Sequence, residues 1–281
     1  MKKLILVLML QTSTILACDG VLPPNDLYFS PMDKNEGLSE IQYHEVIDKV
    51  EKVYAPVAKE YDATLIIDRK WSSGTVNAGT FREVKKKRWI INLYGGLARH
   101  PLITEDSYAL VICHEIGHHI GGAPKKIIDE KIFWASTEGQ SDYWATLKCL
   151  RRVLKKENNE LVIKDFIVPP IVSSECENSF NSKKEHALCI RLAMAGQALS
   201  KISAGIRLAP IPEFDTPDSN IVTQVFDKHP VPQCRLDSYF QGALCPQSLR
   251  ENVSQLEDKK GTCHFDDGYK AGRRPLCWYR H

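Results

Sequence analysis

The sequence predicts an α+β fold in which a small sheet flanks a helix that carries a candidate metal-binding motif. Three short runs have strand composition: ATLIIDR at 63–69, GTVNAGTF at 74–81 and RWIINLY at 88–94. Apolar residues recur at helical spacing before these runs and in several segments after them. With 43% hydrophobic and 26% charged residues, the chain has the composition of a globular protein with enough core for a compact fold.

The helical pattern predicts four helices. They are expected at residues 39–61, 104–120, 136–152 and 183–208. The first should break or kink at Pro56, because proline removes a backbone donor and crowds the preceding turn. The second has a capping residue, Thr104, at its start and a glycine, Gly121, at its end.

Three other segments separate the predicted helices and strands. The basic cluster at 85–88 separates two strand runs and is expected to be a solvated hairpin end. The apolar run at 161–172 is interrupted by prolines, which excludes a regular central strand. Five prolines between 210 and 232 indicate a loop.

The segment VICHEIGHHIGG at 111–122 places three histidines and a glutamate in an apolar helix. His114 and His118 are four residues apart, so their side chains stack on one helix face and can hold one Zn²⁺ at about 2.0–2.1 Å. Glu115 lies beside them and is suited to take a proton from a water molecule that the metal activates. His119 points about 100° away from His118 and is not expected to be a ligand.

A third protein ligand is needed, because catalytic zinc usually takes three protein groups. In the segment ASTEGQSDYWATLKCLRR at 135–152, Ser136 can cap a helix on which Glu138 and Asp142 share one face. Glu138 is the predicted third ligand. Asp142 is predicted to accept a hydrogen bond from the outer nitrogen of a ligand histidine. The alternative for this pair is a solvated helix face.

The combined motifs resemble the gluzincin metallopeptidases of the CAAX prenyl protease and HtpX type, which carry HExxH on one helix and ExxxD on a second. The matching stretches are EDSYALVICHEIGHHIGG at 105–122, EGQSDYWA at 138–145, VNAGTF at 76–81, WIINLYGGLARHPLITED at 89–106 and HPVPQCRL at 229–236. The resemblance implies a zincin-like fold with one Zn²⁺ per chain. The gap from His118 to Glu138 is short for this family, and nothing resembles its multi-span membrane members. The resemblance therefore implies no particular substrate.

The HPVPQCRL element matches the family's downstream His-Pro element, which predicts that His229 lies over the metal cleft. There it would either donate a hydrogen bond to an oxyanion during hydrolysis or occupy the open metal position in a resting state. Arg235, which keeps its charge, would pair with a carboxylate at the rim or bind substrate carbonyls. A solvated loop histidine is the alternative for His229.

The resemblance also implies that the strand near Asn77 and Ala78 forms the edge beside the cleft, where an extended peptide could add through main-chain hydrogen bonds. The predicted function is a zinc endopeptidase with a protein or peptide substrate. Two alternatives remain: a zinc-binding lipoprotein that acts as a chaperone or scaffold, and a metallohydrolase that acts on cell-wall crosslinks.

The first 17 residues are typical of an export signal, with two lysines followed by a short apolar run. The sequence ILAC at 15–18 resembles a bacterial lipobox, which predicts a lipid on Cys18 and a membrane-anchored protein on the periplasmic side of a bacterial envelope. Ordinary cleavage near Ala17 is the alternative. Loss of Lys2 and Lys3 lowers the formal net charge from +2 to about zero, which gives no reason to expect a nucleic-acid partner.

Eight cysteines remain when Cys18 is set aside, and an even set in an exported chain suggests up to four disulfides. Cys113 is expected to be packed or bridged rather than a ligand. A second, structural zinc site near the C-terminus is disfavoured because paired CxxC spacing is absent. The expected organisation is a signal (1–17), a linker (18–38), a peptidase domain (39–209) and a Pro-rich, Cys-rich C-terminal extension packed on it (210–281).

Overall fold

The computed structural model describes residues 20–33 and 36–280. Its helices and strands, in chain order, are α1 (Glu40–Glu60), β1 (Thr64–Lys70), β2 (Ala78–Glu83), β3 (Arg88–Tyr94), α2 (Gly95–Ala98), α3 (Glu105–Ile120), β4 (Lys125–Ile128), β5 (Lys131–Ser136), α4 (Glu138–Trp144), a π-helix (Ala145–Leu150), α5 (Arg151–Leu154), α6 (Asn159–Val162), α7 (Pro170–Ser179), α8 (Lys183–Arg207) and α9 (Pro232–Leu244). Short 3₁₀ turns occupy Val84–Lys86, Ile163–Asp165 and Phe265–Asp267. The predicted α+β class is confirmed.

The three predicted strands form one small sheet in the order β1-β3-β2. β1 pairs with β3 in parallel, and β2 pairs with β3 in antiparallel register, so β2 lies at an edge. The basic cluster at 85–88 is exposed at the end of the β2–β3 hairpin, as predicted. As an edge strand, β2 can therefore contact a further extended segment.

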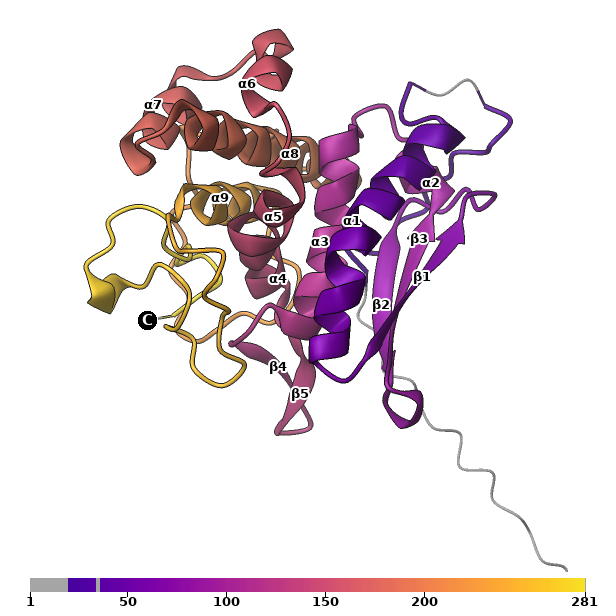
Figure 1. Cartoon of the computed structure of the whole chain (residues 1–281), viewed down its shortest axis with the longest axis horizontal. Helices are drawn as coiled ribbons and strands as arrows, with labels where there is room; N and C mark the ends of the chain where they lie inside the picture. The colour runs from indigo at the N-terminus through magenta and orange to yellow at the C-terminus, as the bar shows by residue number, and fades with distance from the viewer. Residues whose placement is uncertain (1–19, 34–35, 281) are drawn as a thin grey trace, which may run out of the picture.

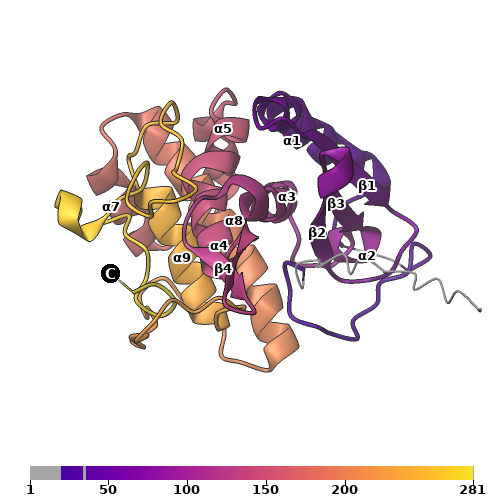
Figure 2. The same cartoon turned by 90° about the horizontal axis from the view of Figure 1, so that it is seen from below.

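Helix α3 lies in the middle of the molecule, with the sheet on one side and α8 and α9 on the other (Figures 1 and 2). α3 contacts both the sheet and α8, which explains why every residue from Ser107 to Ile120 is buried. α1 packs beside α3 on the sheet, and the Tyr43 hydroxyl donates to the carbonyl oxygen of Leu93 at 2.9 Å. The candidate metal motif thus lies on a helix that is buried along most of its length.

The ends of α3 follow the sequence signals. The Thr104 side chain accepts a hydrogen bond from the backbone of Ser107, whose side chain bonds back to Thr104, and the helix ends at Gly121. Gly117 lets α4 approach closely, since a Cβ there would lie 3.1 Å from the Cα of Ser141. This close approach brings the two motif-bearing helices together.

Several details differ from expectation. α1 continues through Pro56 instead of breaking, because most of its stability comes from its buried face. Thr137 caps α4 in place of the predicted Ser136. Ser136 is the last residue of β5, and its hydroxyl donates to the carbonyl oxygen of Gly122. The β4–β5 hairpin and the helices α6 and α7 have no counterpart in the sequence-based prediction, whereas the π-helix lies within the helix predicted at 136–152.

The segment after residue 210 also contains more structure than predicted. The chain from 210 to 231 is irregular, as expected, but Pro232 then begins α9, at a position where its missing donor costs nothing. α9 packs against α8 and α4, and its buried Leu236 and Tyr239 belong to the same hydrophobic core as α3. The predicted extension is therefore continuous with the core of the preceding part.

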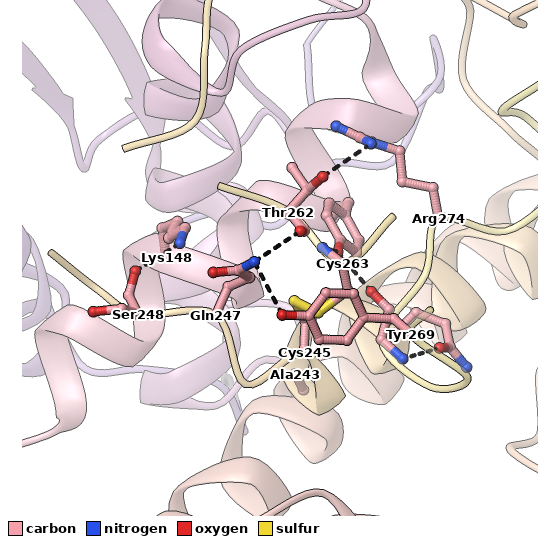
Figure 3. The surroundings of a disulfide bond; sticks show 12 residues. Lys148, Ala243, Cys245, Gln247, Ser248, Thr262, Cys263, Tyr269 and Arg274 are labelled. Carbon is pink, nitrogen blue, oxygen red and sulfur yellow. Dashed lines mark hydrogen bonds between the residues drawn. A yellow bond between two sulfur atoms is a disulfide. The ribbon is translucent and has the colours of Figure 1, made fainter. Parts of the chain in front are cut away.

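All eight cysteines of the described residues are paired. The disulfides are Cys113–Cys149, Cys176–Cys189, Cys234–Cys277 and Cys245–Cys263. Figure 3 shows the last of these, which holds the end of α9 against the C-terminal segment, where Gln247 donates to the carbonyl oxygen of Thr262 and to the Tyr269 hydroxyl. The first two disulfides join helices, α3 to the π-helix and α7 to α8, whereas the other two join α9 and its C-cap residue to the C-terminal segment.

The predicted signal, residues 1–17, and the predicted lipidation site Cys18 lie outside the described residues. Within 20–33 and 36–280, no helix has both the length and the apolar character that crossing a membrane would require.

Candidate metal centre

Three potential ligands converge between α3 and α4. The Nε2 atoms of His114 and His118 lie 3.1 Å apart, and they lie 3.2 and 3.5 Å from Oε2 of Glu138. Two ligands at about 2.0–2.1 Å in tetrahedral geometry would lie about 3.3 Å apart. All three side chains have 0% exposure. The group therefore has the spacing and the donor atoms to hold a metal ion.

Hydrogen bonds to the outer ring nitrogens fix the orientation of both histidines. Nδ1 of His114 donates to Oδ1 of Asp142 at 2.7 Å, and Nδ1 of His118 donates to the carbonyl oxygen of Ser136 at 2.9 Å. Because these protons are on Nδ1, the lone pair of each Nε2 faces the convergence point. The side-chain hydroxyl of Ser141 lies 3.1 Å from the same nitrogen of His118.

Asp142 is itself held in place by α9. Nε and one terminal nitrogen of Arg235 each donate to the carboxylate at 2.8 Å, and the Tyr239 hydroxyl donates to Oδ1. Burial alone would raise the pKa of Asp142, but the positive charge of Arg235 and the bond with His114 lower it to about 2. Asp142 is thus an ionised acceptor, as its predicted position behind a ligand histidine requires.

The two oxygens of Glu138 have different surroundings. Oε1 accepts from Nζ of Lys126, in β4, at 2.7 Å, while Oε2 faces the two histidines. A monodentate ligand held in this way keeps its coordinating oxygen in one position.

Glu115 follows His114 on α3 and has 0% exposure. Among the described residues, neither of its carboxylate oxygens has a hydrogen-bond partner. Burial raises the pKa of this carboxyl group above its usual value. A buried carboxylate without a partner is costly, so this position is suited to a group that engages water or substrate.

His119 is excluded from the ligand group, as predicted. Its Nε2 lies 2.7 Å from the Thr80 hydroxyl, and its Nδ1 accepts from Nε of Arg82 at 3.1 Å. Its ring stacks between Trp89 and Trp134, at centroid distances of 4.8 and 4.9 Å. His119 therefore joins α3 to the sheet and to β5.

His229, in the loop before α9, lies beside the ligand group. Its Nε2 is 3.3 Å from Oε2 of Glu138 and donates to the carbonyl oxygen of Gly20 at 2.6 Å. Burial lowers the pKa of this imidazole. Since Nε2 carries the proton in this hydrogen bond, His229 acts as a donor in this arrangement and is not one of the three converging ligands.

Arg235 pairs with a carboxylate, which is one of its two predicted roles, but the location of that pair differs from the prediction. Its partner carboxylate is the buried Asp142 instead of one at the rim, and its side chain is only 1% exposed. Its remaining donors reach the Tyr239 hydroxyl and the carbonyl oxygen of Val21. The sequence pattern identified the charge but not its burial by the core around α9.

The predicted edge strand is β2, which begins at Ala78 directly after Asn77, but its start is already in contact with another segment. The Asn77 side chain bonds to both the backbone N–H and the carbonyl oxygen of Leu22, and the Ala78 carbonyl oxygen accepts from the backbone of Val21. The chain's own N-terminal segment thus occupies this edge.

Two residues of the site were not predicted. Lys126 lies on a hairpin with no clear sequence signal, whereas Tyr239 lies four residues after Arg235 and so could have been found from the helical spacing.

Elsewhere, Asp218 lies close to Cys234 and Cys277, but both sulfurs are in a disulfide. A cavity of about 560 Å³ near residues 217–221 and 273–276 is not lined by any residue of the metal group.

No match to this chain was found in a scan against protein-family models, in a search of curated proteins or in a search of solved structures. The resemblance to gluzincins therefore rests on the motif residues of the sequence.

Proposed function

We propose that the protein is a zinc-dependent endopeptidase with a zincin-like site, in which Glu115 is the general base. The observation that carries this proposal is the convergence of His114, His118 and Glu138 beside a buried carboxylate that has no protein partner. A purely structural metal site has no need of such a carboxylate, because it closes its coordination with protein ligands alone.

A zinc ion held by this group would polarise a scissile carbonyl and lower the pKa of an attacking water molecule. Glu115 would take the proton from that water and pass it to the leaving amine. Asp142 would keep His114 in one tautomer through the reaction. His229, whose Nε2–H already faces a carbonyl oxygen, would donate to the oxyanion that forms.

We also propose an envelope location, on the periplasmic side of a bacterial membrane, with a lipid on Cys18 as the anchor. The four disulfides support an oxidising compartment. Proteins or peptides of that compartment would be the substrates. Mass spectrometry of the N-terminal peptide tests this part, since an unmodified thiol at Cys18 would contradict it.

The function is tested by incubating purified protein with unfolded proteins, a broad peptide library and cell-wall fragments. We expect cleavage of peptide bonds by the native chain, no cleavage by Glu115→Gln, and native activity in Glu105→Gln, an exposed glutamate on the same helix. Release of cell-wall fragments alone would favour the cell-wall hydrolase instead. Suppression of aggregation by native and Glu115→Gln proteins alike, without cleavage, would favour the chaperone or scaffold.

A further inference from the structure

The N-terminal segment Gly20–Leu22 runs along the edge of the sheet beside the metal group. The Val21 N–H donates to the Ala78 carbonyl oxygen at 3.1 Å, and the Leu22 N–H donates to the Asn77 side chain at 3.1 Å. Since residues 21 and 22 face residues 78 and 77, the segment is antiparallel to β2. It therefore lies along the sheet edge in the direction that an added antiparallel peptide would take.

The same segment contacts the residues around the metal group. The Gly20 carbonyl oxygen accepts from Nε2 of His229 at 2.6 Å, and the Val21 carbonyl oxygen accepts from Arg235 at 2.5 Å. Nε2 of His229 is also only 3.3 Å from Oε2 of Glu138. A main-chain carbonyl of the chain itself thus lies next to the proposed catalytic group.

The segment also explains how completely the site is closed. Val21 and Leu22 are 0% exposed, as are the three converging ligands and Glu115. An incoming peptide would need the hydrogen-bonding atoms of the β2 edge and of His229, and these are already engaged. A peptide substrate and the segment therefore compete for the same groups.

We infer that Gly20–Leu22 is a built-in inhibitor, which occupies the peptide-binding edge in the resting protein and must leave before a substrate reaches the metal group. This inference rests on the proposed peptidase function. It names the substrate as an extended peptide that pairs with β2 at Asn77 and Ala78.

Gly20 offers a way to weaken the segment without changing the metal group. Its φ is +91°, and a Cβ there would lie 2.5 Å from the Ala78 carbonyl oxygen and 2.7 Å from the Asn77 side chain. Any side chain at this position meets both a disfavoured backbone angle and a backbone atom. Leu22→Asp is a second such change, because it would place a charge in a fully buried position.

The experiment measures how fast diethyl pyrocarbonate modifies His114 and His118 in the full chain, with and without one equivalent of zinc, and follows peptide hydrolysis in parallel. In the absence of zinc, we expect Gly20→Ala and Leu22→Asp to be modified about tenfold faster than the native chain. The matched control is Gly268→Ala, an exposed glycine with φ +78° and no neighbouring atom that a Cβ would meet.

The outcomes separate the two proposals. Faster modification together with faster hydrolysis supports both. Faster modification without hydrolysis by any of the proteins supports closure by the segment and contradicts the peptidase function. If both variants are modified at the native rate, the inhibitor is contradicted, whereas hydrolysis by the native chain would still support the peptidase.

Discussion

Oδ1 of Asp142 accepts a hydrogen bond from Nδ1 of His114 at 2.7 Å, and both side chains are fully buried. The bond orients the imidazole and places its lone pair toward His118 and Glu138. Arg235 balances the charge of the carboxylate through two bonds of its own. Because a buried carboxylate needs such a partner, α9 contributes to the metal group without supplying a ligand.

The first prediction concerns this bond. Asp142→Ala should weaken zinc affinity or activity by about 10–100-fold, because His114 loses the acceptor that fixes its tautomer. Competition with a chromogenic chelator measures the affinity. Asp237→Ala, on a carboxylate that does not contact the group, is the control. Native zinc affinity and activity in Asp142→Ala would remove Asp142 from its proposed role.

The second prediction concerns His229. If it donates to the oxyanion, His229→Ala should lower turnover at saturating peptide by about 100–1000-fold and leave zinc bound. We expect this result because Nε2 already donates to a carbonyl oxygen. A rise in turnover would instead indicate that the imidazole blocks the metal position. An unchanged turnover would indicate that His229 is a loop residue with no role in catalysis.

The third prediction concerns the disulfide between α3 and the π-helix. Replacing Cys113 and Cys149 together by alanine should lower the free energy of unfolding by about 4 kcal/mol, since the bond closes a loop of 36 residues. The same change at Cys176 and Cys189, which close a loop of 13 residues, should cost about 3 kcal/mol. Denaturant titration measures both, and the absence of any effect at the first pair would contradict its stabilising role.

The fourth prediction concerns pH. Burial raises the pKa of Asp237 to about 6 from the ordinary 3.8. The folded state therefore binds more protons than the unfolded state between these values, and this group lowers stability as the pH rises through them. Relative to the native chain, Asp237→Asn should gain about 2–3 kcal/mol of stability between pH 3.8 and pH 7. A stability difference that is independent of pH would contradict this assignment.

Much of the fold follows from local signals. Thr104 and Gly121 delimit α3, and the composition of 64–70 and 88–94 is typical of strands. The i, i+4 spacing of His114 and His118 places them on one face whatever the rest of the chain does. These features depend on neighbours in the sequence, so the sequence alone predicts them.

Other features depend on contacts between distant segments. The segment near residue 20 reaches Ala78 and His229, and Lys126 reaches Glu138 from a weakly patterned hairpin. The burial of Arg235 depends on how α9 packs in the core. No local periodicity encodes these contacts, which is why neither the occupied edge nor the burial of the Arg235–Asp142 pair was predicted.

The most direct test of the account is the zinc content of the purified chain after reconstitution and removal of free metal. We predict one zinc ion per chain for the native protein and for His119→Gln, and less than about a tenth of that for His118→Ala, since only His118 of these neighbours faces Glu138. Circular dichroism confirms that each variant is folded. A native chain that holds no zinc, or a folded His118→Ala protein that retains a full equivalent, would contradict the proposed metal centre.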